Sequence, residues 1–450
     1  MSAYAGKHVI VVGAGCTGLG LARFFLDRGA DVTLSDSRRR EDIGGVDELA
    51  ARGVRFDCGG HDAALMAAAD LVAISPGIAL DVPAVAGAMA AGVPVLGEIE
   101  IAARELAAPM IAITGTNGKS TTTCLVGEIL QRWNRRAFVG GNLGTPLIEA
   151  TRNSDWDWIV AEISSFQLEA IETFRPRYGL LLNLTEDHLD RYPDMASYVA
   201  AKLRLFENMT AADVAILNAD DALVMRCAEA LPCRKICFSS SRVLQQGMGF
   251  DGQDIVWRFD GGEQRFAVSQ LRLKGLHNVE NAMAALIAPL LEGCPADLAW
   301  QAVCGFSGLD HRMVRVRELD GVTWYDDSKG TNVGSVVKSL AGLEAPVTLI
   351  AGGKDKGGDY APLAQLMRDK VAHLILIGQA ADRMQQAFSG LTGILRAATL
   401  EEAVQMAFDL TAPGGTVLLS PGCSSFDMFR SYAERGAVFC RAVQALQSRG

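Results

Sequence analysis

The chain has 450 residues, of which 49% are hydrophobic and 21% charged, a composition that excludes a disordered or low-complexity protein. At roughly 150 residues per domain, this length predicts about three domains. The 42 basic and 52 acidic residues give a net charge of −10, the wrong sign for a protein whose main partner is a nucleic-acid backbone. We therefore expect no nucleic-acid partner.

We expect neither an export signal nor a membrane span from this sequence. Residues 1–7 lack the charged and apolar regions of a signal peptide and run directly into a strand-like segment. The longest apolar stretch without charge, residues 82–97, is interrupted by proline and glycine and is shorter than the roughly 20 residues that cross a bilayer. The ten cysteines form no C-x-x-C pair, so we interpret them as buried thiols of a reducing cytosol. We expect a cytoplasmic monomer that does not insert into membranes.

Short apolar runs that alternate with helical patterns follow one another along the chain. They lie at residues 9–12, 32–34, 71–74, 110–114, 158–161, 180–184, 214–218, 347–351, 374–378 and 417–420. This rhythm predicts βαβ units and an α/β fold with parallel sheets. Because a single sheet of ten or more strands is unusual, we expect the strands to divide among several domains.

We place domain boundaries after residues 97 and 308. The first precedes a new nucleotide-type unit, and the second lies where Phe306-Ser-Gly308 interrupts a helical pattern. The predicted domains are an N-terminal Rossmann-like domain (1–97), a central P-loop-type ATPase domain with a mainly parallel sheet (98–308) and a C-terminal Rossmann-like domain (309–450). Within the central domain, the glycine-rich residues 238–273 are typical of an antiparallel hairpin insert.

The first glycine-rich turn, Gly13-Ala-Gly15-Cys-Thr-Gly18, follows a strand and opens a helical pattern. Asp36 ends the next strand at about the distance expected for a ribose-binding carboxylate. Taken alone, this pattern favours an NAD-dependent dehydrogenase. Backbone amides at a helix N-terminus bind any nucleotide diphosphate equally well, so a different nucleotide is a second interpretation. A tight turn without a ligand is a third.

A second phosphate loop follows another apolar strand, with the sequence Gly115-Thr-Asn-Gly118-Lys119-Ser120-Thr121. Its amides, ammonium and hydroxyl are the groups that cradle phosphates and hold Mg²⁺. Ile113 occupies the place of the first glycine in the general P-loop pattern, which favours a short-loop variant. Because a dehydrogenase does not need this loop, its presence favours ATP chemistry.

Motifs from one end of the chain to the other resemble those of the Mur ligases, the ATP-dependent amide-forming enzymes of peptidoglycan precursor synthesis. Besides the second loop they are Gly140-Gly-Asn142-Leu-Gly144, Glu162-Ile-Ser-Ser-Phe-Gln-Leu168, Asn183-Leu-Thr-Glu-Asp-His188, Ala201-Lys202, His277-Asn278, His311-Arg312, Asp327-Ser-Lys329 and Ser420-Pro-Gly-Cys-Ser-Ser425. The resemblance is strongest to the member that adds D-glutamate to UDP-N-acetylmuramoyl-L-alanine. It implies ATP and Mg²⁺ as cofactors, two small-molecule substrates and an acyl-phosphate intermediate.

The resemblance also implies roles for individual residues. The ATP site would comprise Gly115, Thr116, Asn117, Gly118, Lys119, Ser120, Thr121, Asn278, Asn281, Arg312, Asp327 and Lys329. The pocket for the UDP substrate would comprise Gly15, Cys16, Thr17, Asp36, Ser37, Arg38, Ser75, Gly77 and Asn142. The D-glutamate site would comprise Lys329, Thr331, Lys356, Ser425 and Phe426, with Lys354 as an alternative to Lys356.

The catalytic group implied in the same way is Lys119, Glu162, His188, Lys202 and Arg312. Two Mg²⁺ ions would be held by Ser120, Glu162, His188 and Lys202. Lys202 would be carbamylated, which turns an ammonium that repels Mg²⁺ into an anionic ligand.

Each of these residues also has a plainer interpretation from the sequence alone. Glu162 follows an apolar strand, where a carboxylate either binds a metal or is merely exposed. His188 lies in an acidic loop but is as well explained as a structural histidine, and Lys202 as a solvated helix lysine. Asn278 and Asn281 are one helical turn apart, so their amides share a face.

Three other functions stay open at this point. Another ATP-dependent ligase, such as a folylpolyglutamate synthase, would share the second loop but not an N-terminal UDP-type domain. A dehydrogenase and a nucleotide-binding module without enzymatic activity are the remaining alternatives.

Overall fold

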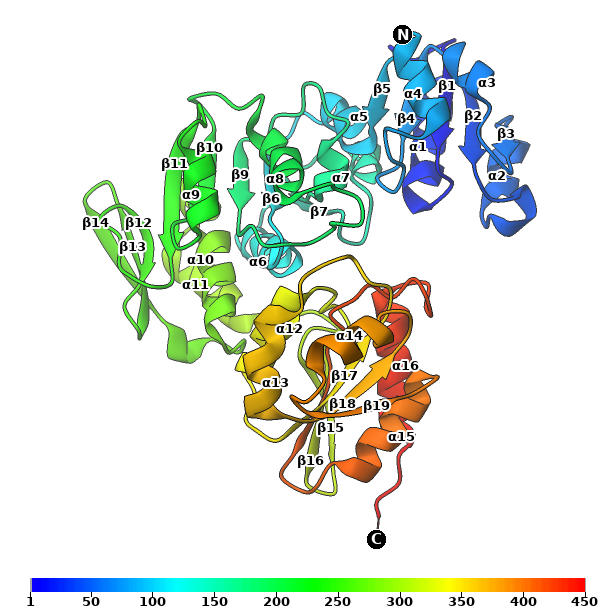
Figure 1. Ribbon diagram of the computed structural model, residues 1–450. Helices are drawn as coiled ribbons and strands as arrows, with labels where there is room; N and C mark the ends of the chain where they lie inside the picture. Colours follow the sequence, from blue (N-terminus) through cyan, green and yellow to red (C-terminus); the bar gives the residue numbers. More distant parts are fainter. Residues whose placement is uncertain (1, 450) are drawn as a thin grey trace. The chain divides into compact units, whose positions relative to one another are not determined.

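The computed structural model describes residues 2–449, which form an α/β protein with three sheets (Figure 1). By internal contacts the chain divides into two compact units. Unit 1 comprises the residues up to Leu184, Val199–Arg272 and Asn278–Phe306; unit 2 comprises Thr185–Tyr198, Leu273–His277 and the residues from Ser307 on. Among the described helices, none has the length and apolar character needed to span a bilayer.

The first sheet of unit 1 has five parallel strands in the order β3-β2-β1-β4-β5. They are β1 (His8–Val12), β2 (Asp31–Asp36), β3 (Arg55–Cys58), β4 (Leu71–Ile74) and β5 (Val95–Gly97), with helices α1 (Cys16–Asp27), α2 (Val46–Ala51), α3 (Ala63–Ala67) and α4 (Pro83–Ala90) and the 3₁₀ helix η1 (Arg40–Asp42). The central strand β1 is an unbroken run of buried Val and Ile after His8, as expected for a strand covered on both faces.

The second sheet of unit 1 has nine strands in the order β14-β13-β12-β11-β10-β9-β6-β8-β7. They are β6 (Met110–Thr114), β7 (Ala137–Gly141), β8 (Trp158–Glu162), β9 (Tyr178–Leu181), β10 (Val214–Asn218), β11 (Arg234–Ser239), β12 (Gly247–Phe250), β13 (Asp254–Phe259) and β14 (Gly262–Ala267). The pairs β12·β13 and β13·β14 are antiparallel and the others are parallel. The predicted hairpin insert is confirmed as this antiparallel edge.

The helices of this second part are α5 (Glu98–Glu105), α6 (Lys119–Arg132), α7 (Ser165–Leu168), α8 (Met195–Leu203), α9 (Ala222–Ala228), α10 (Leu276–Leu291) and α11 (Ala296–Gly305), with 3₁₀ helices η2 (Leu147–Arg152), η3 (Arg204–Phe206) and η4 (Val268–Gln270). Helices α6, α10 and α11 share one core with the strands. This packing holds the N-terminus of α6 at the carboxyl end of β6, which is where ligands bind in open α/β sheets.

Unit 2 contains a six-stranded sheet in the order β15-β16-β20-β17-β18-β19. Its elements are β15 (Val314–Leu319), β16 (Val322–Asp326), β17 (Val347–Gly352), β18 (Val371–Ile377), β19 (Gly393–Arg396), β20 (Thr416–Leu419), α12 (Val333–Ala341), η5 (Ala361–Leu363), α13 (Ala364–Lys370), α14 (Ala381–Phe388), α15 (Leu400–Leu410) and α16 (Tyr432–Ala445). Leu349 packs with α12, α13 and α14, whereas its neighbour Ile350 packs with α15 and α16. Alternate residues of a strand thus face two helical layers.

One expectation about the cysteines is wrong. All ten are free, as expected, but Cys16 is exposed, and among the others only Cys233, Cys294 and Cys423 are fully buried. Cys16 is the first residue of α1, and its neighbour Gly15 is also exposed. The side chain at this position therefore extends from the glycine turn rather than into the core.

Two buried glutamates on α5 have pKa values that are shifted in opposite directions. Glu98 accepts a hydrogen bond from the Ile148 amide at 2.6 Å, and burial raises its pKa from 4.5 to about 7. Burial also acts against ionisation of Glu100, but hydrogen bonds from Thr173, Glu172 and Arg104 outweigh it, so the pKa of Glu100 is lowered. The number of donors that reach each carboxyl group decides which effect dominates.

We expect Glu98→Gln to change how stability depends on pH. Because the pKa of Glu98 is higher in the folded than in the unfolded protein, protonated Glu98 contributes roughly 3 kcal/mol to the free energy of unfolding below about pH 4.5. This contribution is lost as the pH rises through about 7. Urea unfolding at intervals between pH 4.5 and 8 should show that loss in the parent protein and not in Glu98→Gln. An identical pH slope in both proteins would contradict this assignment.

The matched control is Glu100→Gln on the same helix. Because the pKa of Glu100 is lowered, its contribution is present above its unfolded value and disappears as the pH falls. This variant should therefore be destabilised at pH 7, by about 1.5–3 kcal/mol for lost hydrogen bonds to a charged group, and less so in acid.

Candidate active site

The second phosphate loop connects β6 to α6, and two of its glycines are required by its shape. Gly118, which precedes α6, has φ +88°, and a Cβ there would lie 2.3 Å from Oδ1 of Asn281. Gly115 has φ +140° and lies against Leu182 and Asn183. A left-handed backbone without side chains leaves the amides at the start of α6 accessible, which is the geometry of a phosphate cradle.

Asn183 holds this loop from the neighbouring strand. Its side chain accepts a hydrogen bond from the Asn117 amide at 2.8 Å and donates one to the Asn117 carbonyl at 3.0 Å, while its carbonyl accepts one from the Thr116 amide at 2.9 Å. From the sequence, Asn183 was recognisable only as part of a motif. Its place as the one polar residue within the apolar run at 180–184 was the signal that could have identified it.

Two lysines meet at the carbonyl oxygen of Gly115. Lys119 donates to this oxygen at 3.0 Å and to the Thr116 carbonyl at 2.9 Å. Lys202, which is only 2% exposed, donates to the same Gly115 oxygen at 2.9 Å. The interpretation of Lys202 as a solvated helix lysine is therefore wrong, because α8 directs its side chain into the loop.

Glu162 lies at the carboxyl end of β8 and is 2% exposed. Its Oε1 accepts a hydrogen bond of 2.6 Å from the amide of Asn142, and its carbonyl accepts one from the Asn142 backbone at 2.8 Å. The structure thus joins a residue expected in the metal site to one expected in the UDP-substrate pocket. Ser120, with 1% exposure, is the second residue of α6.

The asparagine pair on α10 supports the loop as well. The two side chains are 3.4 Å apart, from Nδ2 of Asn281 to Oδ1 of Asn278, which confirms that they share a face. Oδ1 of Asn281 also accepts a hydrogen bond of 3.4 Å from Thr122 on α6.

The first glycine turn is tightly closed. A Cβ on Gly18 would lie 1.7 Å from the carbonyl oxygen of Gly13, and the same oxygen accepts a hydrogen bond of 3.0 Å from the hydroxyl of Ser75. Gly15 and Cys16 are exposed at the start of α1, and Ser37 and Gly77 are exposed on the loops after β2 and β4. Thr17, on α1, is half-buried.

Asp36 supports this turn from the end of β2. Its carboxylate accepts hydrogen bonds from the Ala14 amide at 2.6 Å and from Nε of Arg38 at 2.9 Å. Burial opposes ionisation of Asp36, but the bonds from Arg38 and Ala14 outweigh it and lower the pKa to about 2. Asp36 therefore stays ionised at neutral pH and fixes Arg38 beside the glycine turn.

We expect Asp36→Asn to weaken binding of a ligand at the first glycine turn, which the resemblance assigns to the UDP substrate. Losing the charged partner of Arg38 costs about 1.5 kcal/mol, which corresponds to a roughly tenfold higher KM with little change in kcat. Asp57→Asn on β3 is the control, because Asp57 bonds Ser35 and the Asp62 amide and not the turn. Equal KM values in both variants would contradict this role.

In unit 2, Asp187 is the centre of a buried polar cluster. It accepts hydrogen bonds from Lys356 at 3.1 Å and from Asn332 at 3.0 Å. Burial acts to raise its pKa, but Lys356 and His188 outweigh this and lower it to about 2. Lys356 is thus paired with Asp187, whereas the side chain of Lys354 is exposed.

His188 follows Asp187 with φ +58°, a left-handed conformation uncommon for a residue with a side chain. Its Nε2 lies 3.7 Å from Oδ2 of Asp187, and its side chain is 29% exposed. An acidic neighbour holds the ring in place and leaves it partly accessible.

The segment after β16 positions two further expected residues. Asp327 is buried, accepts hydrogen bonds from the hydroxyls of Ser339 and Ser420, both at 2.7 Å, and has its pKa raised by burial to about 6. Lys329 donates to the hydroxyl of Tyr432 at 3.2 Å and lies 4.7 Å from the centre of its ring. Tyr432, on α16, was missed because it is distant in sequence from Lys329.

The other residues expected in unit 2 differ in accessibility. Ser425 is 2% exposed and Phe426 is 70% exposed, while Thr331 is half-buried beside Lys329.

Two basic side chains of unit 2, those of Arg312 and His277, are partly buried. Within residues 2–449, the buried Nε of Arg312 has no hydrogen-bond acceptor. Burial, together with the charges of Lys338 and Arg312, lowers the pKa of His277 to about 4, so this imidazole is neutral at pH 7.

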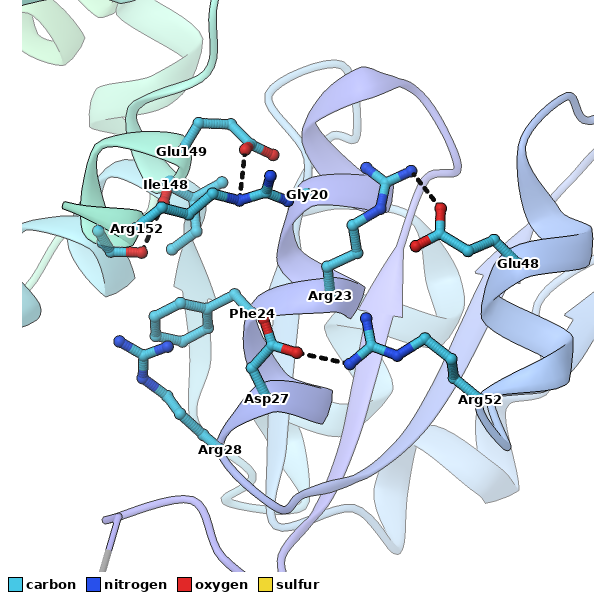
Figure 2. A pocket seen from close by; sticks show the side chains of 11 residues that line it. Gly20, Arg23, Phe24, Asp27, Arg28, Glu48, Arg52, Ile148, Glu149 and Arg152 are labelled. Carbon is cyan, nitrogen blue, oxygen red and sulfur yellow. Dashed lines mark hydrogen bonds and ion pairs between the residues drawn. The ribbon is translucent and has the colours of Figure 1, made fainter.

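A separate cavity of about 690 Å³ in unit 1 is lined by α1, α2 and η2 (Figure 2). None of the expected site residues lines it. Its arginines are paired: Arg23 with Glu48 at 3.3 Å, Arg52 with Asp27 at 2.5 Å, Arg152 with Glu149 at 2.8 Å and Arg28 with Glu105 at 2.8 Å. Because acidic residues of the wall, together with Glu105 outside it, neutralise this positive charge, the cavity does not have the character of an anion site.

Family models and curated relatives of this chain belong to the Mur ligases. Three family models match: "Mur ligase MurD-like, N-terminal domain" at residues 7–97, "Mur ligase middle domain" at 113–289 and "Mur ligase, glutamate ligase domain" at 311–423. A UDP-N-acetylmuramoylalanine–D-glutamate ligase from Syntrophotalea carbinolica is 80% identical over 450 residues, which is 100% of both chains. A ligase of the same name from Geotalea uraniireducens is 51% identical over 98% of each chain.

Among solved structures, a pseudomurein peptide ligase type C from Methanothermus fervidus has a TM-score of 0.61 at 19% identity, covering 93% of this chain and 97% of its own. At 19% identity this structural similarity supports the fold assignment alone. The identities of 80% and 51% over full length, together with three matching domain models in order, exclude the dehydrogenase interpretation of the first glycine turn. The chain belongs to the Mur ligase family.

Proposed function

We propose that this protein joins D-glutamate to UDP-N-acetylmuramoyl-L-alanine and converts ATP to ADP and phosphate, as a step of peptidoglycan precursor synthesis. The observation that carries the proposal is the 80% identity, over the full length of both chains, with a ligase named for this reaction. The phosphate loop at the end of β6, with Lys119, Lys202 and Glu162 around it, has the chemistry that such a reaction needs.

The reaction has two steps. An oxygen of the substrate carboxylate attacks the γ-phosphorus of ATP, the bond to ADP breaks and an acyl phosphate forms. The D-glutamate amine then attacks the acyl carbon, a tetrahedral intermediate loses phosphate, and the amine gives up a proton. Both partners of the first step are negative, so catalysis consists mainly of positioning and charge compensation.

The residues of the phosphate loop fit ATP. The two glycines form a cradle that a Cβ would fill, and the amides at the start of α6 face the phosphates. Lys119 exchanges its bonds to the loop carbonyls for the β- and γ-phosphates. Asn278 and Asn281 contact the adenine, and Arg312, Asp327 and Lys329 complete the nucleotide site, with Arg312 compensating the transferring charge.

The oxygen donors present also fit Mg²⁺, since the buried hydroxyl of Ser120 and the buried carboxylate of Glu162 are hard ligands. When bound, Mg²⁺ neutralises phosphate charge and orients the γ-phosphoryl group. His188 adds an imidazole ligand for a second ion. Asn142 keeps Glu162 in one orientation through the 2.6 Å hydrogen bond.

Lys202 serves this metal site as a carbamate. Two ammonium groups on one carbonyl oxygen repel each other, and both would repel Mg²⁺. The Lys202 ammonium first loses a proton to solvent, and the amine then attacks CO₂ and loses a second proton as the N–C bond forms. The resulting carbamate places a negative charge where one of these positive charges was. Carbon-13 NMR of protein equilibrated with ¹³C-bicarbonate should show a carbamate resonance that is absent from Lys202→Ala; no such resonance in the parent protein would contradict the modification.

The remaining expected residues form two substrate sites. The UDP substrate binds at Gly15, Cys16, Thr17, Asp36, Ser37, Arg38, Ser75, Gly77 and Asn142. D-glutamate binds at Lys329, Thr331, Lys356, Ser425 and Phe426, where cations and hydroxyls suit its carboxylates. We place the domain boundaries at residues 97/98 and 308/309, and the reaction in the cytoplasm, carried out by a monomer.

An assay of phosphate release tests the function. Purified protein with ATP, Mg²⁺ and UDP-N-acetylmuramoyl-L-alanine should release phosphate in a manner that depends on D-glutamate. Equal rates with L-glutamate would refute the proposed amino-acid specificity. Ligation of glutamate to a folate in place of the UDP substrate would indicate the other ATP-dependent ligase.

A further inference from the structure

Three residues from distant parts of the chain bring metal-ligating atoms together in unit 2. His311, Asp326 and Cys440 each offer one ligand atom, and these atoms lie within 4.8 Å of one another. Nδ1 of His311 is 2.6 Å from Oδ2 of Asp326, and the thiol of Cys440 donates to the same oxygen at 3.3 Å. An imidazole nitrogen, a carboxylate oxygen and a sulfur form a donor set that Zn²⁺ prefers.

The fold holds the three groups from three different elements. Asp326 is the last residue of β16 and is 1% exposed. His311 precedes β15 in a left-handed conformation with φ +63°, and Cys440 lies on α16. These sequence distances explain why the cysteine spacing alone matched no zinc pattern.

Gly436 on α16 creates the space for the imidazole. A Cβ at this position would lie 2.1 Å from Nδ1 of His311, so the ring packs directly on the helix backbone. Cys440 is one helical turn further along, which places its sulfur on the same face of α16 as Gly436. The helix therefore presents the ring and the thiol side by side to Asp326.

We propose that His311, Asp326 and Cys440 form a binding site for one Zn²⁺ ion, separate from the Mg²⁺ ligands of the ligase reaction. Three protein ligands leave a fourth position for water, and the side chain of His311 is 18% exposed, which gives the ion a route from solvent. As the zinc–sulfur bond forms, the thiol proton passes to solvent, and no electron transfer is involved.

The required rearrangement is small. In a tetrahedral site with bonds of about 2.0–2.3 Å, ligand atoms are separated by roughly 3.3–3.7 Å. The present separations of 2.6 Å and 3.3 Å thus need to widen by less than about 1 Å. Mg²⁺ does not compete here, since it prefers oxygen ligands in octahedral geometry.

The ion would also restrain residues assigned to the ligase site, and this part rests on the proposed function. The carbonyl of His311 accepts a hydrogen bond from the Lys329 amide at 3.0 Å, and Arg312 follows His311 directly. A fixed His311 therefore limits the motion of both segments. Binding itself does not depend on ligase activity, so it is measured independently.

Cobalt substitution tests the site in the full-length protein. Co²⁺ titration should produce a sulfur-to-cobalt charge-transfer band that saturates at one ion per chain and is displaced by Zn²⁺. The band should be lost in Cys440→Ala and retained in Cys304→Ala, whose thiol is also half-buried but lies near the amide oxygen of Gln270. No band, or a band of equal intensity in Cys440→Ala, would overturn the proposal.

A thermal shift provides the second readout. Zn²⁺ binding to the folded state should raise the Tm of the parent protein and of Cys304→Ala, but not that of Cys440→Ala. Cys440→Ala should keep its ligase activity without Zn²⁺, because alanine fits a helix and Cys440 is not assigned to a substrate. This activity shows that the variant is folded; an equal rise in Tm for Cys440→Ala would also overturn the site.

Discussion

Replacing Lys119 with methionine should lower kcat/KM for ATP by about 10²- to 10³-fold, the typical effect of removing one preorganised charge from a reacting centre. Methionine keeps most of the volume of the side chain but removes the ammonium group. In the structure this group reaches the carbonyl oxygens of Gly115 and Thr116, so it is held at the loop where the phosphates bind. The initial rate of phosphate release at varied ATP concentrations measures the effect.

The matched control for this prediction is Lys235→Met in the same unit. Lys235 lies on β11, is exposed and donates a hydrogen bond to the Glu229 carbonyl at 3.4 Å, so its loss should leave kcat/KM unchanged. If Lys119→Met turned over ATP within a factor of about ten of the parent rate, the assignment of Lys119 to the phosphates would be wrong.

Replacing Lys202 with alanine should reduce kcat on the order of 10³-fold, because it removes the proposed anionic metal ligand. The side chain is only 2% exposed and reaches the Gly115 carbonyl at 2.9 Å, so the substitution leaves a cavity beside the phosphate loop. Formate or acetate in that cavity should restore part of the activity, since each supplies a carboxylate where the carbamate would lie.

A second additive separates this role from a structural one. If Lys202 acts as an ammonium that supports the loop, methylammonium should rescue Lys202→Ala and formate should not. The carbamate predicts the reverse. Lys119→Met is the specificity control, since carboxylates should not rescue a missing cation at the phosphates. Rescue by methylammonium alone would contradict the carbamate proposal.

Much of the fold could be predicted because buried parallel strands are encoded locally. The run at 110–114 coincides with β6, and the alternation of apolar runs and helical patterns correctly indicated α/β architecture. Edge strands were less predictable: β3 and β19 contain polar and partly exposed residues, so they lack the apolar signal. The expected strand at 180–184 begins earlier, as β9 at Tyr178, and ends at Leu181.

The end of β9 illustrates why local patterns do not mark every boundary. Leu182 and Leu184 are as apolar as the strand before them and are buried, yet this segment leaves the ladder to hold the phosphate loop through Asn183. The apolar run in the sequence therefore extends beyond Leu181, where strand β9 ends and the backbone turns to the phosphate loop.

The candidate site was predictable only in part. The glycines, Lys119 and Ser120 of the phosphate loop lie together in sequence, so their spacing identified them. The pairs Asp187–Lys356 and Lys329–Tyr432 join segments more than a hundred residues apart. No spacing rule encodes such contacts, because they depend on how strands of one sheet bring their connecting loops together.

The central claim, that the protein activates a carboxylate as an acyl phosphate for attack by D-glutamate, is tested most directly by an oxygen-transfer experiment. UDP-N-acetylmuramoyl-L-alanine labelled with ¹⁸O in its terminal carboxylate is incubated with ATP, Mg²⁺ and D-glutamate, and the released phosphate is analysed by mass spectrometry. We predict that one carboxylate oxygen appears in each phosphate released, and only when D-glutamate is present. Phosphate without ¹⁸O would show that the carboxylate is not phosphorylated and would contradict the account.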